Sequence, residues 1–129
     1  MNKNVTLSKI EKEIRERYFF NMDLGSTFKK LLKDRSITQE QIALDLEISR
    51  KTINRILNNK SKGSLLILCL ICLYLKLGPP LSNHIISISG FKFQNNEIDI
   101  VLETLINSNL QLEIIEVKEI IFEKTGLYV

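Results

Sequence analysis

The chain has 129 residues, of which 44% are apolar and 26% are charged, and its net charge is +3. This length is typical of one domain that buries its core without metal ions or disulfides, and one compact domain is therefore our starting expectation. The composition shows no proline or glycine excess and no low-complexity run, which argues against a disordered or fibrous protein.

The charges are unevenly distributed along the chain. Residues 28–62 carry nine basic and four acidic side chains, a net charge of +5, whereas residues 91–129 carry three and seven, a net charge of −4. This asymmetry suggests that an anionic partner meets the middle of the chain and that the acidic end faces something else.

The lack of a recognisable secretory signal and the setting of the two cysteines both predict a cytoplasmic protein. The amino-terminal residues lack the basic stretch and continuous apolar block of a secretory signal. The apolar run 65–75 has 11 residues, far fewer than the roughly 20 needed to span a bilayer. Cys69 and Cys72 lie in that run without a Cys or His cluster to complete a zinc shell, so we interpret them as small buried apolar residues.

The first predicted helix is amphipathic and amino-terminal. Its apolar residues recur every three or four positions and opposite charges lie one turn apart, a pattern typical of a helix with one solvated face. Residues 21–25 break the pattern. Ser26 or Thr27 is then expected to cap a second helix that ends near Arg35. The apolar positions of these two helices are Leu7, Ile10, Ile14 and Tyr18 in the first, and Phe28, Leu31 and Leu32 in the second.

Two short helices are predicted next. Thr38 and Gln41 form a capping-box pattern, in which the Thr38 hydroxyl accepts from the Gln41 backbone and the Gln41 side chain reaches back. The helix that they open should end at Leu46. Ser49 supplies a second cap for a helix through Leu57, which the following asparagines terminate.

The remaining predicted elements are also helical. Ser64 is expected to cap a helix over 65–76 that is apolar on all sides, and a short helix over 82–89 should end at Gly90. Asn96 is expected to start another helix, with Ile98, Val101, Leu102, Leu105 and Ile106 as its apolar stripe. The last predicted helix, 112–124, sets an acidic strip of Glu116, Glu119 and Glu123 opposite an apolar arc of Ile114, Ile115, Val117, Ile120, Ile121 and Phe122, and Gly126 ends it. No segment alternates like a half-buried strand, so we predict an all-α protein of about eight short helices.

The helices predicted over 38–46 and 49–57 are joined by too few residues to form an antiparallel pair. They are expected to cross steeply, as in a helix-turn-helix. Apolar side chains occupy the positions that such a crossing would bury, and Ala43 is small where the second helix must approach closely. The predicted shared core is Ile42, Leu46, Ile48, Ile53, Ile56 and Leu57.

The opposite face of the second short helix is polar and basic. Asparagine and arginine can read base edges through two hydrogen bonds, and lysine can hold a phosphate. Gln39 lies in the first turn of the preceding helix, where its side chain and backbone N–H groups can meet a phosphate. Lys62 is a further candidate for phosphate contact. The predicted DNA-contacting residues are Gln39, Ser49, Arg50, Lys51, Thr52, Asn54, Arg55, Asn58 and Lys60.

At this point the chain resembles a known family. Residues 28–88, and above all FKKLLKDRSITQEQIALDLEISRKTINRILNNK, are similar to the helix-turn-helix domain of Cro and lambda repressor. The resemblance implies that five helices pack together and that the third enters a major groove. The matching features are Thr38-Gln39-Glu40, Ala43, Ile48-Ser49-Arg50, the Ile53/Ile56 pair and Asn58-Asn59-Lys60.

The end of the chain further resembles small regulators of this type from Gram-positive bacteria, which extend the five helices with a helical tail. The expected organisation is an amino-terminal helix and linker over 1–25, a DNA-binding domain over 26–90 and a helical extension over 91–129 that packs on the same core. One position departs from the motif, because Glu47 stands where the family prefers glycine. A left-handed turn at a non-glycine residue costs about 1 kcal/mol or somewhat more.

The resemblance and the charge pattern together predict a sequence-specific regulator of transcription, acting as a repressor on double-stranded DNA in the cytoplasm at the nucleoid. The apolar surface of residues 65–75 and 114–122 favours a homodimer that forms through helices outside the helix-turn-helix. Such a dimer would span two half-sites about 34 Å apart on the DNA. The alternative is an interaction protein, such as an antitoxin, whose acidic tail over 91–129 binds a partner protein. An enzyme is not expected, since one histidine and no phosphate-binding loop offer no catalytic set, and no cofactor or metal is predicted.

Overall fold

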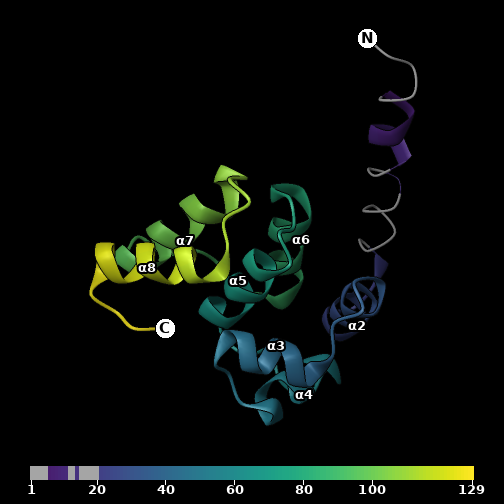
Figure 1. Ribbon diagram of the computed structural model, residues 1–129, viewed down its shortest axis with the longest axis horizontal. Helices are drawn as coiled ribbons and strands as arrows, with labels where there is room; N and C mark the ends of the chain where they lie inside the picture. Colours follow the sequence, from purple (N-terminus) through teal and green to yellow (C-terminus); the bar gives the residue numbers. More distant parts are fainter. Residues whose placement is uncertain (1–5, 12–13, 15–20) are drawn as a thin grey trace.

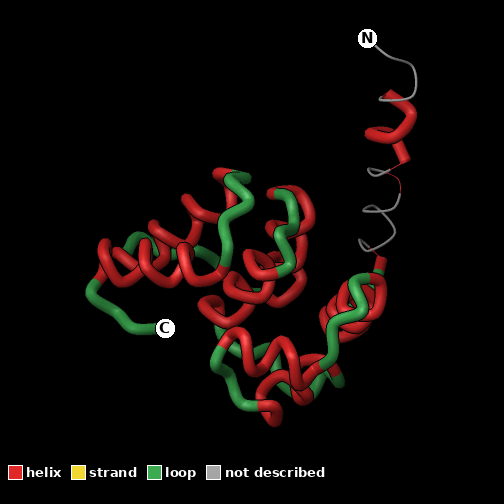
Figure 2. Tube along the Cα trace, viewed as in Figure 1, coloured by secondary structure: helices red, strands yellow, loops and turns green. Residues whose placement is uncertain are grey.

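The computed structural model describes residues 6–11, 14 and 21–129. Within these ranges every regular element is helical, as Figure 2 shows, and the prediction of an all-α protein is confirmed. Residues 6–11 are helical, in agreement with the predicted amino-terminal helix, whereas Tyr18 lies outside the described residues. The helices that follow are α2 (Leu24–Asp34), α3 (Gln39–Leu46), α4 (Arg50–Leu57), α5 (Leu65–Tyr74), α6 (Pro79–Ser89), α7 (Glu97–Ser108) and α8 (Ile114–Thr125).

Polar side chains begin most of these helices. A side-chain oxygen that accepts a hydrogen bond from a backbone N–H of the first turn satisfies a group that has no partner within the helix. Thr38, Ser49, Ser64 and Asn96 act as N-caps of α3, α4, α5 and α7, as predicted. In α3 only half of the predicted capping box is present, because the Gln41 side chain donates to Asp45 Oδ1 at 2.8 Å instead of reaching back to Thr38.

Two predicted helix starts were wrong. The N-cap of α2 is Asp23, whose carboxylate accepts from Ser26 N at 2.7 Å, so Ser26 is inside the helix that it was expected to cap. Helix α6 begins at Pro79 instead of Ser82, because a proline at the first helical position has no N–H to satisfy and its φ already suits a helix. The prolines therefore start α6, whereas α5 has already ended at Tyr74, where the left-handed Lys76 closes it.

The core is organised around α5, which lies between the α2–α4 group and the α6–α8 group in Figure 1. This helix packs on α3, α6, α7 and α8, which explains why it is apolar on all sides. Its residues 68–72 are all buried. Burial raises the pKa of the Cys72 thiol to about 12 and raises that of Cys69 as well, so the prediction that both are small apolar core residues is confirmed. None of the helices in the described ranges has the length and apolar character needed to cross a membrane.

Helices α7 and α8 extend the fold and share this core. Leu102 of α7 and Val117 and Ile121 of α8 are buried in the same apolar cluster as α5. The start of α8 is fixed by Glu113, whose carboxylate accepts from Lys76 Nζ at 2.5 Å and whose backbone N–H donates to Glu116 Oε1 at 3.1 Å.

One expectation for α8 was confirmed and one was wrong. Glu116, Glu119 and Glu123 are exposed, as a solvated strip requires, and Glu116 also completes a capping box. The apolar arc is narrower than predicted, because the side chains of Ile115 and Phe122 are exposed, 66% and 41% respectively. Among the described residues, α8 therefore presents an exposed apolar pair to solvent.

Candidate nucleic-acid interface

Helices α3 and α4 form the predicted helix-turn-helix. Ile42, Ala43 and Leu46 on α3 and Ile53, Ile56 and Leu57 on α4 are buried where the helices meet. Glu47 occupies the left-handed region, with φ 57°. Ile48 N donates to Ala43 O at 3.0 Å and Glu47 N donates to Leu44 O at 3.2 Å, which closes α3 with a Schellman motif. The turn is therefore left-handed at Glu47, although the residue is not glycine.

The outward face of α4 carries most of the predicted DNA-contacting side chains. Because a helix repeats every 3.6 residues, the burial of Ile53, Ile56 and Leu57 turns the residues between them toward solvent. Gln39 on α3 is half-buried beside this face. The exposed predicted residues of α4 and the turn after it are Arg50, Lys51, Asn54, Arg55, Asn58 and Lys60.

The two hydroxyl groups at the start of α4 are engaged with each other. Ser49 Oγ lies 2.8 Å from Thr52 Oγ1 and accepts from Thr52 N at 3.1 Å. Thr52 is half-buried, whereas Ser49 is exposed. These contacts hold the amino-terminal turn of α4, where free backbone N–H groups favour an anion such as a phosphate.

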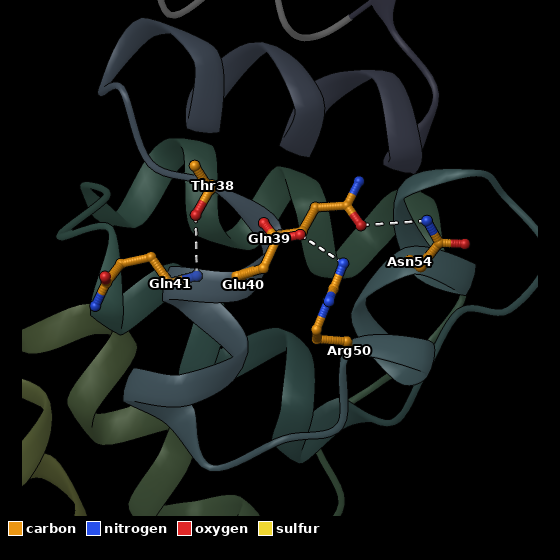
Figure 3. Close-up of polar contacts among 6 residues, drawn as sticks. All are labelled: Thr38, Gln39, Glu40, Gln41, Arg50 and Asn54. Carbon is orange, nitrogen blue, oxygen red and sulfur yellow. Dashed lines mark hydrogen bonds and ion pairs between the residues drawn. The ribbon is translucent and has the colours of Figure 1, made fainter.

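An amide pair bridges the two helices. Asn54 Nδ2 donates to Gln39 Oε1 at 3.2 Å, and Figure 3 shows the two side chains meeting between the start of α3 and the middle of α4. Each amide is held by the other and keeps polar atoms for a further partner. Two residues that were predicted separately are therefore brought together in one preformed polar unit.

Arg50 has a partner that the sequence did not suggest. Its Nη2 lies 2.5 Å from Glu40 Oε1, an ion pair across the α3–α4 crossing that Figure 3 also shows. Both side chains remain more than half exposed, at 68% and 56%, so water screens the pair strongly. In this conformation the Arg50 guanidinium points toward α3, and it must leave Glu40 before it can use its full set of donors on a base.

The carboxyl end of α4 is closed by its own side chains. Arg55 Nη2 donates to Lys60 O at 3.2 Å, and Asn58 Nδ2 donates to Asn54 O at 2.9 Å. These bonds shape the turn that follows α4. Arg55 and Asn58 therefore have a local structural role in addition to the predicted contact with DNA.

Asn59 was predicted only to help end α4, and the sequence interpretation missed its contacts with the start of α2. It has a positive φ of 57°, accepts from Gly25 N at 2.8 Å and donates to Asp23 Oδ1 at 3.1 Å. Hydrogen bonds from the Ser26 backbone and side chain and from Asn59 hold the pKa of Asp23 below its ordinary value. A Cβ on Gly25 would lie 2.4 Å from Leu57 O, so only glycine allows α2 to approach the end of α4 so closely.

Helix α3 is also attached to the centre of the fold. Tyr74 Oη of α5 donates to Asp45 Oδ2 at 2.5 Å. The hydrogen bonds from Tyr74 and Gln41 hold the pKa of Asp45 below its ordinary value, while burial and the same bond raise the pKa of Tyr74 to about 12. Across the described ranges, no group of three or more His, Cys, Asp or Glu side chains is placed to hold a metal ion.

Comparison with known families agrees with this geometry. The family described as helix-turn-helix matches residues 28–81, a segment that runs from α2 into α6. This segment is similar to the Cro/lambda-repressor type of helix-turn-helix domain, and the match supports DNA binding by residues 28–81. Neither the curated proteins nor the solved structures gave a significant match.

Proposed function

We propose that the protein is a sequence-specific repressor of transcription that places α4 in the major groove of double-stranded DNA. The observation that carries this proposal is the exposed amide and basic face of α4, supported from α3 by the Gln39–Asn54 hydrogen bond of 3.2 Å. A repressor of this kind would bind at a promoter in the cytoplasm and obstruct transcription there.

The side chains divide into two roles according to their chemistry. Lysine and the amide at a helix start suit the phosphate backbone, which fixes the position of the protein on the duplex. Arginine and asparagine suit guanine and adenine edges, and a threonine methyl or hydroxyl suits several bases. We assign phosphate contacts to Gln39, Lys51, Lys60 and Lys62, and base contacts to Arg50, Thr52, Asn54 and Arg55, while Ser49 and Asn58 complete the proposed DNA-contacting set.

We further propose that the protein acts as a homodimer through α8. The exposed Ile115 and Phe122, with Tyr128 stacked on Phe122 at a centroid distance of 4.3 Å, provide an apolar surface away from α4. Two copies joined there would present two copies of α4, which a pair of half-sites about 34 Å apart requires. A symmetric dimer would also explain why this face remains apolar.

The exposed face of α8 also supports a second candidate function. Glu116, Glu119 and Glu123 lie on α8 beside the exposed Ile115 and Phe122, and an acidic border around an apolar pair suits a basic partner protein. In this second candidate function, residues 91–129 bind and mask such a partner in the manner of an antitoxin.

The decisive experiment for DNA recognition is fluorescence anisotropy on the DNA upstream of the gene and on scrambled DNA, across a salt series. We expect tighter binding to the upstream DNA and a negative slope of log affinity against log salt. Arg50→Ala and Asn54→Ala should each cost about 1–3 kcal/mol of binding to the upstream DNA.

Lys124→Ala is the control that is matched to Arg50→Ala for loss of one positive charge, because Lys124 is exposed in the last turn of α8. It should leave binding nearly unchanged. Equal and weak binding to both DNAs, unaffected by either substitution in α4, would contradict the proposal and leave the partner-binding function as the better one.

A further inference from the structure

Lys118 connects the carboxy-terminal extension to the helix-turn-helix. It lies in the middle of α8, and its side chain is only 18% exposed. Its Nζ donates to Leu46 O at 3.0 Å and lies 3.9 Å from Glu47 Oε2. A residue 72 positions along the chain therefore contacts the turn that separates α3 from α4.

The carbonyl that Lys118 contacts is at the end of a helix. The carbonyls in the last turn of a helix have no partner within it, and here the Schellman motif satisfies those of Ala43 and Leu44. Leu46 O receives its hydrogen bond from the Lys118 ammonium. A positive charge at this end also interacts favourably with the dipole of α3.

Glu47 makes this contact more important than it would be in a turn with glycine. Its backbone is left-handed, a conformation that a side chain disfavours. Its carboxylate is 81% exposed and belongs to the residue three positions before the start of α4, where it would repel DNA phosphates. Lys118 supplies a positive charge beside that carboxylate and a hydrogen bond to the residue before it, so it supports both the shape and the charge of the turn.

We propose that Lys118 is a positioning residue for DNA recognition, through which the extension holds the α3–α4 turn and thereby orients α4. This inference rests on the proposed function. Ser49 and Arg50 follow the turn within three residues of Glu47, so a displaced turn moves the start of α4 and its reading side chains. Base contacts depend on such geometry much more than phosphate contacts do.

The test compares affinities for upstream DNA and scrambled DNA, measured by anisotropy, for the wild type and Lys118→Met. Methionine keeps the length and apolar character of the lysine stem but removes the charge and the donor. We expect Lys118→Met to lose about fivefold or more in affinity for the upstream DNA while its affinity for scrambled DNA changes little. The ratio of the two affinities is the informative quantity, because a general loss of folded protein would lower both.

Two further single variants and one altered background separate positioning from charge. Lys124→Met removes one positive charge from the same helix at an exposed position and should leave the ratio unchanged. Lys118→Arg keeps a charged donor and should restore most of the ratio. In a Glu47→Gly background, which removes both the strain and the carboxylate, Lys118→Met should have a smaller effect than in the wild type.

The outcomes distinguish the inference from the function on which it rests. A wild type that prefers upstream DNA, together with a Lys118→Met protein that keeps the wild-type ratio, would overturn the positioning role and leave the proposed function intact. A wild type without any preference would remove the proposed function, and the positioning role with it. Thermal unfolding of each variant verifies that the measured protein is folded.

Discussion

Glu40 restrains Arg50 in the free protein, and this contact sets an expectation for DNA affinity. Glu40→Gln should free the Arg50 guanidinium and remove one negative charge near the phosphates. Because the pair is exposed, at 68% and 56%, we expect only a modest gain, about two- to fivefold tighter binding at low salt. Anisotropy titrations at two salt concentrations measure this effect.

Glu119→Gln provides the matched control, since it removes the same charge from an exposed position on α8. It should change the affinity much less than Glu40→Gln. Equal gains from the two variants would indicate that net charge alone is responsible and that the Glu40–Arg50 pair has no specific effect on binding.

Residue-level contacts differ in how far the sequence predicts them. The caps at Thr38, Ser49, Ser64 and Asn96 were predicted because a cap depends on residues only two or three positions apart. The contacts of Glu40, Asn59 and Lys118 were not, because each joins segments 10 to 72 positions apart. Such contacts depend on the crossing of helices, which a local pattern does not specify.

Among the elements, α8 has a buried face and an exposed face, and the two should contribute very differently to stability. Ile121 is completely buried, whereas Ile115 on the same helix is 66% exposed. Ile121→Ala should lower the free energy of unfolding by about 2–5 kcal/mol, and Ile115→Ala should lower the stability of the monomer by less than about 0.5 kcal/mol. Urea denaturation at a protein concentration low enough to favour monomers measures both.

The reason for the difference is that only Ile121 leaves a cavity when it is shortened. Similar small effects of the two substitutions would contradict this prediction, because α8 would then contribute little to the stability of the common core.

Element boundaries were predictable where turn chemistry is unambiguous. Gly90 and Gly126 end α6 and α8 with positive φ, as glycine after a helix suggests. The predicted start of α6 was wrong because the two adjacent prolines were interpreted only as the end of a helix, although a proline at the first helical position also permits a helix to begin. The predicted width of the buried face of α8 was also wrong. Periodicity identifies apolar residues, but it does not show which of them other helices cover.

For the whole molecule, the proposed dimer gives a prediction about size. Analytical ultracentrifugation should find a dimer for the wild type and a monomer for Ile115→Glu, because a carboxylate in the apolar contact would lose its hydration. Leu44→Glu is the control, since Leu44 is 72% exposed on α3 and lies outside the proposed dimer contact. It should remain dimeric.

A monomeric wild type would exclude the dimer and favour a different protein as the partner of α8. Loss of the dimer in Leu44→Glu alone would instead place the contact on the helix-turn-helix.

The burial of residues 68–72 of α5 among its neighbours has a consequence for how proteins of this design can diverge. A change of size at Leu68 or Cys72 must suit several surrounding helices at once, since both residues are fully buried. A recombination that joins this DNA-reading half to a different tail near residue 90 would leave part of α5 without its cover from α7 and α8. Under the proposed function, new DNA specificities should therefore arise mainly by single substitutions on the exposed face of α4, where Asn54 and Arg55 can vary without disturbing the core.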